Sequence, residues 1–260
     1  MAKVSNLIRY TLSALIFIFL SISAVLAEPF LAGINAIDRN HYATAFRSFK
    51  PMAEKGIAEA QNNIGFLYQN GFGVKRSYAN AITWYTRAAE QGLAEAEHNL
   101  GMLNYQGYGL SQNFTIAKRW FSRAADKDLG PSHYMLGLIF YNGDSAAKNP
   151  ERARMHFRDG SKVGDAKSQY MYSYMLLAGE GKKPSSSSSR FGPLFNQEGA
   201  SEEEYKLALL WSQLSARNGH EDAKELVEYA RLHVDLDEIE ISESLADICL
   251  ETQYKKCPSI

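Results

Sequence analysis

The chain has 260 residues, of which 45% are hydrophobic and 22% charged, and its formal net charge is −1. This composition is ordinary for a soluble globular protein, and the length allows a sizeable core. Two cysteines in so long a chain exclude a disulfide scaffold as the main source of stability.

Residues 1–27 have the layout of a secretory signal. Lys3 and Arg9 give a positive start, an apolar run follows at 12–26, and small residues precede the expected cleavage after Ala27. An apolar run of about 15 residues is shorter than the roughly 20 of a spanning helix, which argues against the alternative of an uncleaved anchor. We therefore expect an exported chain, periplasmic or secreted, with no stable membrane span after cleavage.

A 36-residue period dominates the sequence after a short capping helix that we expect at 28–41. Glycine or a small polar residue recurs at this interval in three series, which are Gly56, Gly92, Asp128 and Gly164; Gly71, Gly107, Gly143 and Gly179; and Gly73, Gly109, Ser145 and Gly181. Because independent series in phase mark structural repeats, residues 42–181 are predicted to hold four repeats.

Each unit is predicted to be a pair of helices. The first helix has apolar and small residues at helical spacing, namely Ala81, Trp84, Tyr85, Ala88 and Ala89 in one copy. A glycine ends that helix, a second helix follows at once, and a Gly-x-Gly turn leads into the next unit. Trp84, Trp120 and Trp211 share one repeat position and are predicted as core residues, with ligand contact as the alternative.

The run from Ala81 to Ala96, with Leu100-Gly101 and the Gly-x-Gly turn, resembles the Sel-one-like repeat, a relative of the tetratricopeptide repeat. The resemblance covers about residues 40–234 with one interruption. We expect an all-α fold, a right-handed α-solenoid of helix-turn-helix repeats. The copy at 149–184 has His156 in place of the tryptophan, so we expect it to pack more loosely.

The interruption is a 19-residue excess at 182–200, which includes a run of five serines. Such a composition predicts a mobile loop. Phe191 and Phe195 in this loop are candidates for a docking segment, or they fold back onto the solenoid. The phase resumes in a fifth, divergent repeat at 201–234.

Residues 235–260 are predicted to complete an acidic helical cap with a polar exterior. Cys249 and Cys257 lie eight residues apart in it, and in an exported protein a disulfide between them is expected. The alternative is a redox or metal site, although neither cysteine belongs to a Cys-x-x-Cys motif. Paired cysteines close the last helices of some members of the similar family, which supports the structural role.

Sequence motifs for hydrolases, zinc proteases and phosphate-binding loops do not occur. The histidines are scattered without metal-ligand spacing, at His41, His98, His133, His156, His220 and His233. We therefore predict no catalytic residue, no cofactor and no metal site.

Charge is uneven along the chain. Residues 28–164 hold 16 Lys and Arg against 12 Asp and Glu, whereas residues 201–260 hold 6 against 14. Basic residues concentrate on the first helices of the repeats, at Arg87, Arg119, Arg123, Arg154 and Arg158. In related solenoids these helices line the concave face, so the arginines are a candidate groove for an acidic protein; a solvated helix face is the alternative. Nucleic acid is not expected, since the chain is exported and not strongly basic.

The sequence therefore predicts a non-catalytic scaffold, adaptor or regulator in the cell envelope that binds protein partners through its concave face. The alternatives are a protein that binds cell-wall glycan or peptidoglycan and a secreted factor that meets host proteins.

Overall fold

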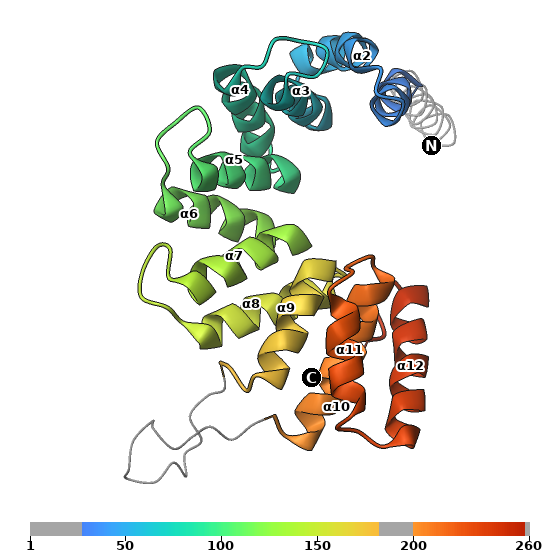
Figure 1. The fold of residues 1–260 in the computed structure, drawn as a ribbon. Coiled ribbons are helices and arrows are strands. Elements are labelled where there is room, and N and C mark those ends of the chain that lie inside the picture. Colours follow the sequence, from blue (N-terminus) through green and yellow to red (C-terminus); the bar gives the residue numbers. More distant parts are fainter. Residues whose placement is uncertain (1–27, 182–199, 258–260) are drawn as a thin grey trace, which may run out of the picture. The chain divides into compact units, whose positions relative to one another are not determined.

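The computed structural model describes residues 28–181 and 200–257, and within these ranges the regular structure is all helical, without strands (Figure 1). The chain divides into two compact units. The N-terminal unit is Met1–Leu100 with Tyr108–Leu110, and the C-terminal unit is Gly101–Gly107 with Ser111–Ile260. The predicted signal at 1–27 and most of the predicted loop at 182–200 lie outside the described residues.

The N-terminal unit is built from helical hairpins. Residues 28–38 are helical, and the helices that follow are α2 Tyr42–Glu54, α3 Ala58–Asn70, α4 Tyr78–Glu90 and the start of α5 Ala94–Gln106. Its core contains the fully buried Phe49, Ile64 and Leu67.

The C-terminal unit continues the same pattern and ends in a three-helix segment. Its helices are α6 Phe114–Ala125, α7 Gly130–Asn142, α8 Pro150–Lys162, α9 Ala166–Leu177, α10 Glu202–Arg217, α11 Ala223–Arg231 and α12 Leu236–Glu251. The largest cluster in its core includes Phe157, Met175 and Trp211.

In α2, α4, α6 and α8 the main buried aromatic residue is the one after the tryptophan position. Tyr85 on α4 and Phe121 on α6 are fully buried, whereas Trp84 and Trp120 are half-buried. The prediction that the tryptophans are core residues is therefore right for Trp211 and holds only in part for Trp84 and Trp120. The reason is that residues 84 and 85 lie only about 100° apart on a helix, so both fit the same apolar stripe.

A glycine in each of the second helices α3, α5 and α7 receives the buried ring of the next repeat. A Cβ at Gly65 would lie 2.7 Å from the ring of Tyr85, and a Cβ at Gly101 would lie 2.6 Å from the ring of Phe121. Gly137 has the same relationship to Phe157. The sequence therefore has glycine at positions 65, 101 and 137 because any larger side chain would occupy the space of the aromatic ring.

The fifth repeat changes both partners of this contact. Ser212 stands at the ring position and Ser173 at the glycine position, and both are buried. The Ser173 hydroxyl donates to the Ala208 carbonyl at 2.8 Å, and the Ser212 hydroxyl donates to that of Leu209 at 3.0 Å. With no ring to receive, the position tolerates a side chain whose hydroxyl has its own acceptor.

Helix starts also follow the 36-residue period. Ser77, Asn113 and Asn149 are N-caps whose side chains accept the backbone N–H three residues later, at 3.3, 2.9 and 2.9 Å. These bonds satisfy donors that an α-helix leaves open at its first turn.

The repeat at 149–184 is not loosely packed at the positions that depart from the pattern. Phe157, Gly160 and Ser161 are buried, as their counterparts are in the preceding repeats. The Ser161 hydroxyl donates to the Phe157 carbonyl at 2.7 Å, which satisfies its polar group inside the core. The expectation of looser packing there is wrong, because a small residue bonded to its own helix replaces alanine without a gap.

The last helices carry a disulfide and an exterior that is not uniformly polar. Cys249 and Cys257 are joined, with their Cα atoms 4.8 Å apart. Leu232, which follows α11, and Leu236, at the start of α12, are 82% and 79% exposed, and Ile241 on α12 is 51% exposed. The expected polar exterior therefore holds only in part.

Candidate protein-binding surface

Two repeats present an arginine stacked on a half-exposed tryptophan. On α4 the Arg87 guanidinium lies 4.6 Å from the centre of the Trp84 ring, and on α6 that of Arg123 lies 4.9 Å from the Trp120 ring. The three-residue spacing places both side chains on one side of the helix, where a cation over an indole face is stabilised. We call these the Trp–Arg pairs.

The Trp–Arg pairs sit at the edge of the buried stripe. In the N-terminal unit the Trp84 ring packs against the core cluster, so the helix holds the indole in place while part of it stays accessible. Tyr85 beside it is anchored in the core and its hydroxyl donates to Gln69 Oε1 at 2.8 Å. Burial raises the pKa of the Tyr85 phenol, so this group stays neutral and structural.

The third copy of this position has a different arrangement. His156 replaces the tryptophan and stacks on Phe140, with ring centres 5.5 Å apart and planes within 2°. Asp159 stands where Arg87 and Arg123 stand, and it pairs with Arg158 at 3.1 Å. Burial, followed by the charge of His133, lowers the pKa of His156 to about 4. This copy therefore presents a neutral ring and an ion pair in place of a stacked cation.

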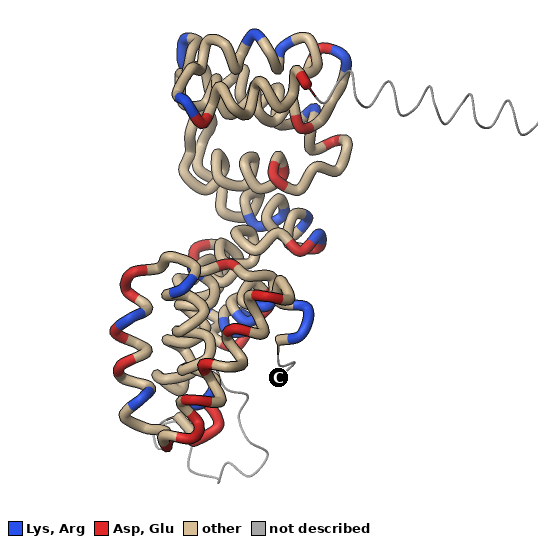
Figure 2. Tube along the Cα trace, turned by 90° about the vertical axis from the view of Figure 1, so that its right-hand side faces the viewer, with Lys and Arg blue, Asp and Glu red and all other residues tan. Residues whose placement is uncertain are grey.

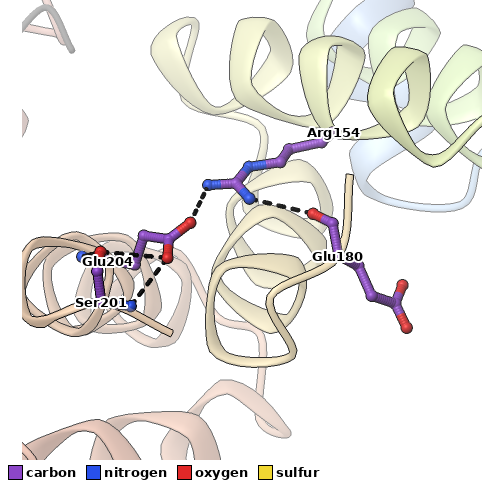
Figure 3. Close-up of polar contacts among 4 residues, drawn as sticks. All are labelled: Arg154, Glu180, Ser201 and Glu204. Atoms are coloured by element: carbon purple, nitrogen blue, oxygen red, sulfur yellow. Dashed lines mark hydrogen bonds and ion pairs between the residues drawn. The ribbon is translucent and has the colours of Figure 1, made fainter. Parts of the chain in front are cut away.

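Arg154 has a structural role (Figure 3). It projects from α8 and its Nη2 lies 2.7 Å from Glu204 Oε1, while its Nη1 donates to the Glu180 carbonyl at 3.1 Å. Glu204 in turn accepts the Ser201 backbone N–H at 2.9 Å and completes a capping box at the start of α10. Both side chains are largely buried, with 17% and 12% of the Arg154 and Glu204 side chains exposed. We call this the Arg154 clasp.

The Arg154 clasp connects the segment before residues 182–199 with the segment after them. Glu180 precedes them and Ser201 follows them, and one guanidinium reaches both ends. Sequence reasoning missed Glu204 as its partner, although Ser201-x-x-Glu204 is a readable capping-box signature.

The five arginines of the predicted groove thus have three kinds of surroundings. Arg87 and Arg123 stack on tryptophans, Arg154 and Arg158 pair with carboxylates, and Arg119 is exposed on α6 with no hydrogen bond or ion pair to the rest of the described chain. The candidates Phe191, Phe195 and Ala27 lie outside the described residues.

The acidic residues of the C-terminal segment recur along its last helices (Figure 2). On α12, which has six acidic residues and no basic one, three of the six are paired with cations of α10 and α11. These pairs are Glu238 with Lys206, Glu243 with Arg231 and Asp247 with Arg217. Much of the acidic charge therefore holds the three helices together.

The described residues also bear on metal binding and on membrane insertion. Residues 28–181 and 200–257 contain no group of three or more His, Cys, Asp or Glu side chains placed to hold a metal ion. None of the helices in the same ranges has both the length and the apolar character needed to cross a bilayer.

The model of the Sel1 repeat matches five segments of the chain. They are residues 58–93, 94–129, 130–162, 166–190 and 192–220. The chain belongs to the Sel1 repeat family. The Sel1 matches begin at α3, so a repeat in the family's frame starts with the helix described above as the second of each pair.

Solved Sel1 structures share this all-α solenoid fold. A Sel1 repeat protein from Oxalobacter formigenes is 26% identical, with 80% of this chain and 79% of that chain covered and a TM-score of 0.62. The c5321 protein, described as a protective antigen of uropathogenic Escherichia coli with an SLR fold, is 21% identical, with coverages of 88% and 55% and a TM-score of 0.56. No curated protein matches the chain. Sel1 repeat proteins are generally scaffolds for protein interactions, and this general function extends to the chain as a member of the family.

Proposed function

We propose that this Sel1 repeat protein is an exported, non-catalytic adaptor that binds a partner protein through the Trp–Arg pairs. The observation that carries the proposal is that two successive repeats hold a half-exposed indole under an exposed guanidinium at the same position. Tryptophan and arginine are the residue types most enriched among the energetically dominant contacts of protein interfaces.

The pairs suit recognition because their shape is fixed before a partner binds. Each indole is held by its helix, and each arginine is held over the indole, so little side-chain freedom is lost on binding. The Arg87 guanidinium, which lies over the Trp84 ring, has N–H donors at its edge that a carboxylate can accept from. The partner that fits is a segment with an apolar or aromatic group next to carboxylates.

Export is the second part of the proposal, and two independent features support it. The sequence of residues 1–27 has the features of a signal peptide, and the disulfide between Cys249 and Cys257 is of the kind that persists in oxidising compartments. Cell fractionation with thiol trapping tests this part, because an exported protein is expected outside the cytoplasm with both thiols oxidised. A reduced protein in the cytoplasm would contradict it.

The binding surface is tested with a charge-reversal variant and a matched control. The variant is Arg87→Glu with Arg123→Glu, and the control is Lys55→Glu with Lys148→Glu, two exposed lysines outside the Trp–Arg pairs. Crosslinking in the native compartment followed by mass spectrometry is expected to lose the partner in the variant only. Retention of the same partner by the variant would overturn the assignment of the surface.

The alternative function, binding of cell-wall glycan, predicts a different result. If the chain sediments with purified wall material and crosslinks to no protein, the adaptor proposal fails. Aromatic rings also stack on sugars, so the same Trp–Arg pairs would then be examined with wall fragments.

A further inference from the structure

The last helix of the C-terminal unit, α12, leaves one of its sides uncovered. Its buried side, with Ser242, Ala246 and Cys249, packs against α10. Its outer side carries Ile241 and Ile248, which are 51% and 38% exposed, and α12 lies on the outside of its unit in Figure 1. Single exposed apolar residues are common on protein surfaces, so the arrangement of these two with their neighbours decides what the side can bind.

A shallow groove of about 410 Å³ runs along this outer side. Its lining residues form two rows with a four-residue spacing, which are Asp237, Ile241 and Leu245 in one row and Glu240 and Ser244 in the other. Ile248 continues the second row. Side chains at this spacing form the ridges of an α-helix, and the space between two ridges is the groove into which another helix packs. The shape of the groove therefore matches a ridge of a second helix.

The charge of the groove is negative and is not compensated within the described chain. Asp237 and Glu240 are exposed, and neither carboxylate has a hydrogen bond or an ion pair to another side chain in residues 28–181 and 200–257. Of the six carboxylates of α12, three are paired with cations of α10 and α11, and two of the other three line the groove. No cation lines it. The groove therefore favours a positively charged occupant.

A second copy of the same helix is a poor occupant. An antiparallel copy centred on Ser244 would place Asp237 opposite Glu251 and Ile241 opposite Asp247. A parallel copy would place Asp237 opposite its own counterpart. Like charges that face one another across an interface cost free energy, and an anionic lipid surface would be repelled for the same reason.

We propose that the α12 groove, lined by Asp237, Glu240, Ile241, Ser244 and Leu245, binds a basic amphipathic helix of a partner protein. Apolar side chains four residues apart on that helix lie between the two ridges, and its Lys or Arg side chains pair with Asp237 and Glu240. This inference goes beyond the proposed function, because the α12 groove shares no residue with the Trp–Arg pairs and prefers the opposite charge. The chain then has two interaction surfaces, which is what an adaptor needs to join two partners.

Fluorescence anisotropy with labelled peptides and the full chain tests the proposal. The first probe is an alanine-rich helical peptide with a leucine at every fourth position and lysines beside the leucines. The second probe has glutamate in place of each lysine. The lysine peptide is expected to bind roughly tenfold more tightly than the glutamate peptide, and added salt is expected to reduce the difference. Absence of binding by the lysine peptide, or equal binding of both peptides, would overturn the proposal.

Variants locate the binding on α12. Asp237→Lys with Glu240→Lys is expected to reverse the preference, so that the glutamate peptide binds more tightly. Ile241→Ser is expected to weaken the binding of the lysine peptide a few-fold without loss of the fold, since this residue is 51% exposed. The matched control is Glu59→Lys with Glu95→Lys, which makes the same change of charge at exposed residues near the starts of α3 and α5. An unchanged preference in the α12 variant, or the same reversal in the control, would overturn the proposal.

Sedimentation velocity of the full chain tests a second copy as the occupant. Ile241→Ser is expected to leave the sedimentation coefficient unchanged, because like charges oppose the packing of two α12 helices. A dimer of the wild type that Ile241→Ser dissociates would assign the α12 groove to a second copy and overturn the proposal.

Discussion

The ring of Phe121 lies so close to the backbone of Gly101 that a Cβ at position 101 would come within 2.6 Å of it. Phe121 is fully buried and comes from the first helix of the following repeat. The contact joins the second helix of one repeat to the first helix of the next, and the 36-residue period repeats it. The stacking of successive hairpins thus depends on contacts between an aromatic ring of one repeat and a glycine of the repeat before it.

Gly101→Ala is expected to lower the free energy of unfolding by about 1–3 kcal/mol, because an overpacked core must move the ring. Urea unfolding followed by circular dichroism measures the change. The double variant Gly101→Ser with Phe121→Ser copies the native Ser173 and Ser212 pair, so the effects of its two substitutions should be non-additive. Additive effects would show that the ring and the glycine are not coupled.

Arg154 and Arg158 lie on the same helix but should differ in their contribution to stability. Arg154→Met removes the guanidinium from the largely buried Glu204 and is expected to cost about 3 kcal/mol of unfolding free energy. Arg158→Met breaks a pair whose side chains are 37% and 35% exposed and is expected to cost less than about 1 kcal/mol. Equal costs in denaturant unfolding would show that the Arg154 clasp is not formed in solution.

Stability is expected to fall as the pH drops from about 6.5 to about 4. Burial lowers the pKa of His98 and of His156 to about 4 in the folded chain, so the unfolded chain binds these protons first. The stabilising effect of the neutral rings is complete above the unfolded pKa and is lost as the pH falls through this window.

Within the window each histidine contributes a slope of up to about 1.4 kcal/mol per pH unit. Unfolding free energies measured between pH 4 and pH 7 check this expectation, with roughly two protons taken up on unfolding in the window. The His98→Gln with His156→Gln variant should flatten the dependence. An unchanged slope in that variant would assign the effect to carboxylates instead.

Reduction of the disulfide is expected to destabilise the last helix. Cys249 and Cys257 close a loop of eight residues, for which loss of the crosslink costs about 2.5 kcal/mol by chain entropy. Thermal unfolding with and without a phosphine reductant measures the shift, and Cys257→Ala is expected to reproduce it. If that variant unfolds like the oxidised wild type, the crosslink contributes nothing to stability.

The repeat period and the helical hairpins were readable from the sequence, because glycines with left-handed backbone recur at fixed intervals. Gly71, Gly107 and Gly143 have φ of 72°, 74° and 81°, a region where other residues are strained. The period also placed the tryptophans correctly along the chain. The period did not show whether the tryptophan or the aromatic residue after it is fully buried, because the packing of the neighbouring helix decides which side of the apolar stripe faces the interior.

The site was less predictable than the fold. Arg154 and Arg87 look equivalent in the sequence, since both are arginines on first helices. Glu204, the partner of Arg154, is 50 residues away in the sequence, across an insertion that interrupts the 36-residue period. No local sequence pattern therefore predicts this ion pair.

The Arg154 clasp makes the junction at Glu180 and Ser201 a natural place to graft a reporter. The Arg154 guanidinium ties both sides of the junction to α8, so α9 and α10 are expected to stay folded when the chain between them is replaced. A fluorescent domain spliced between them is expected to report on the protein in living cells.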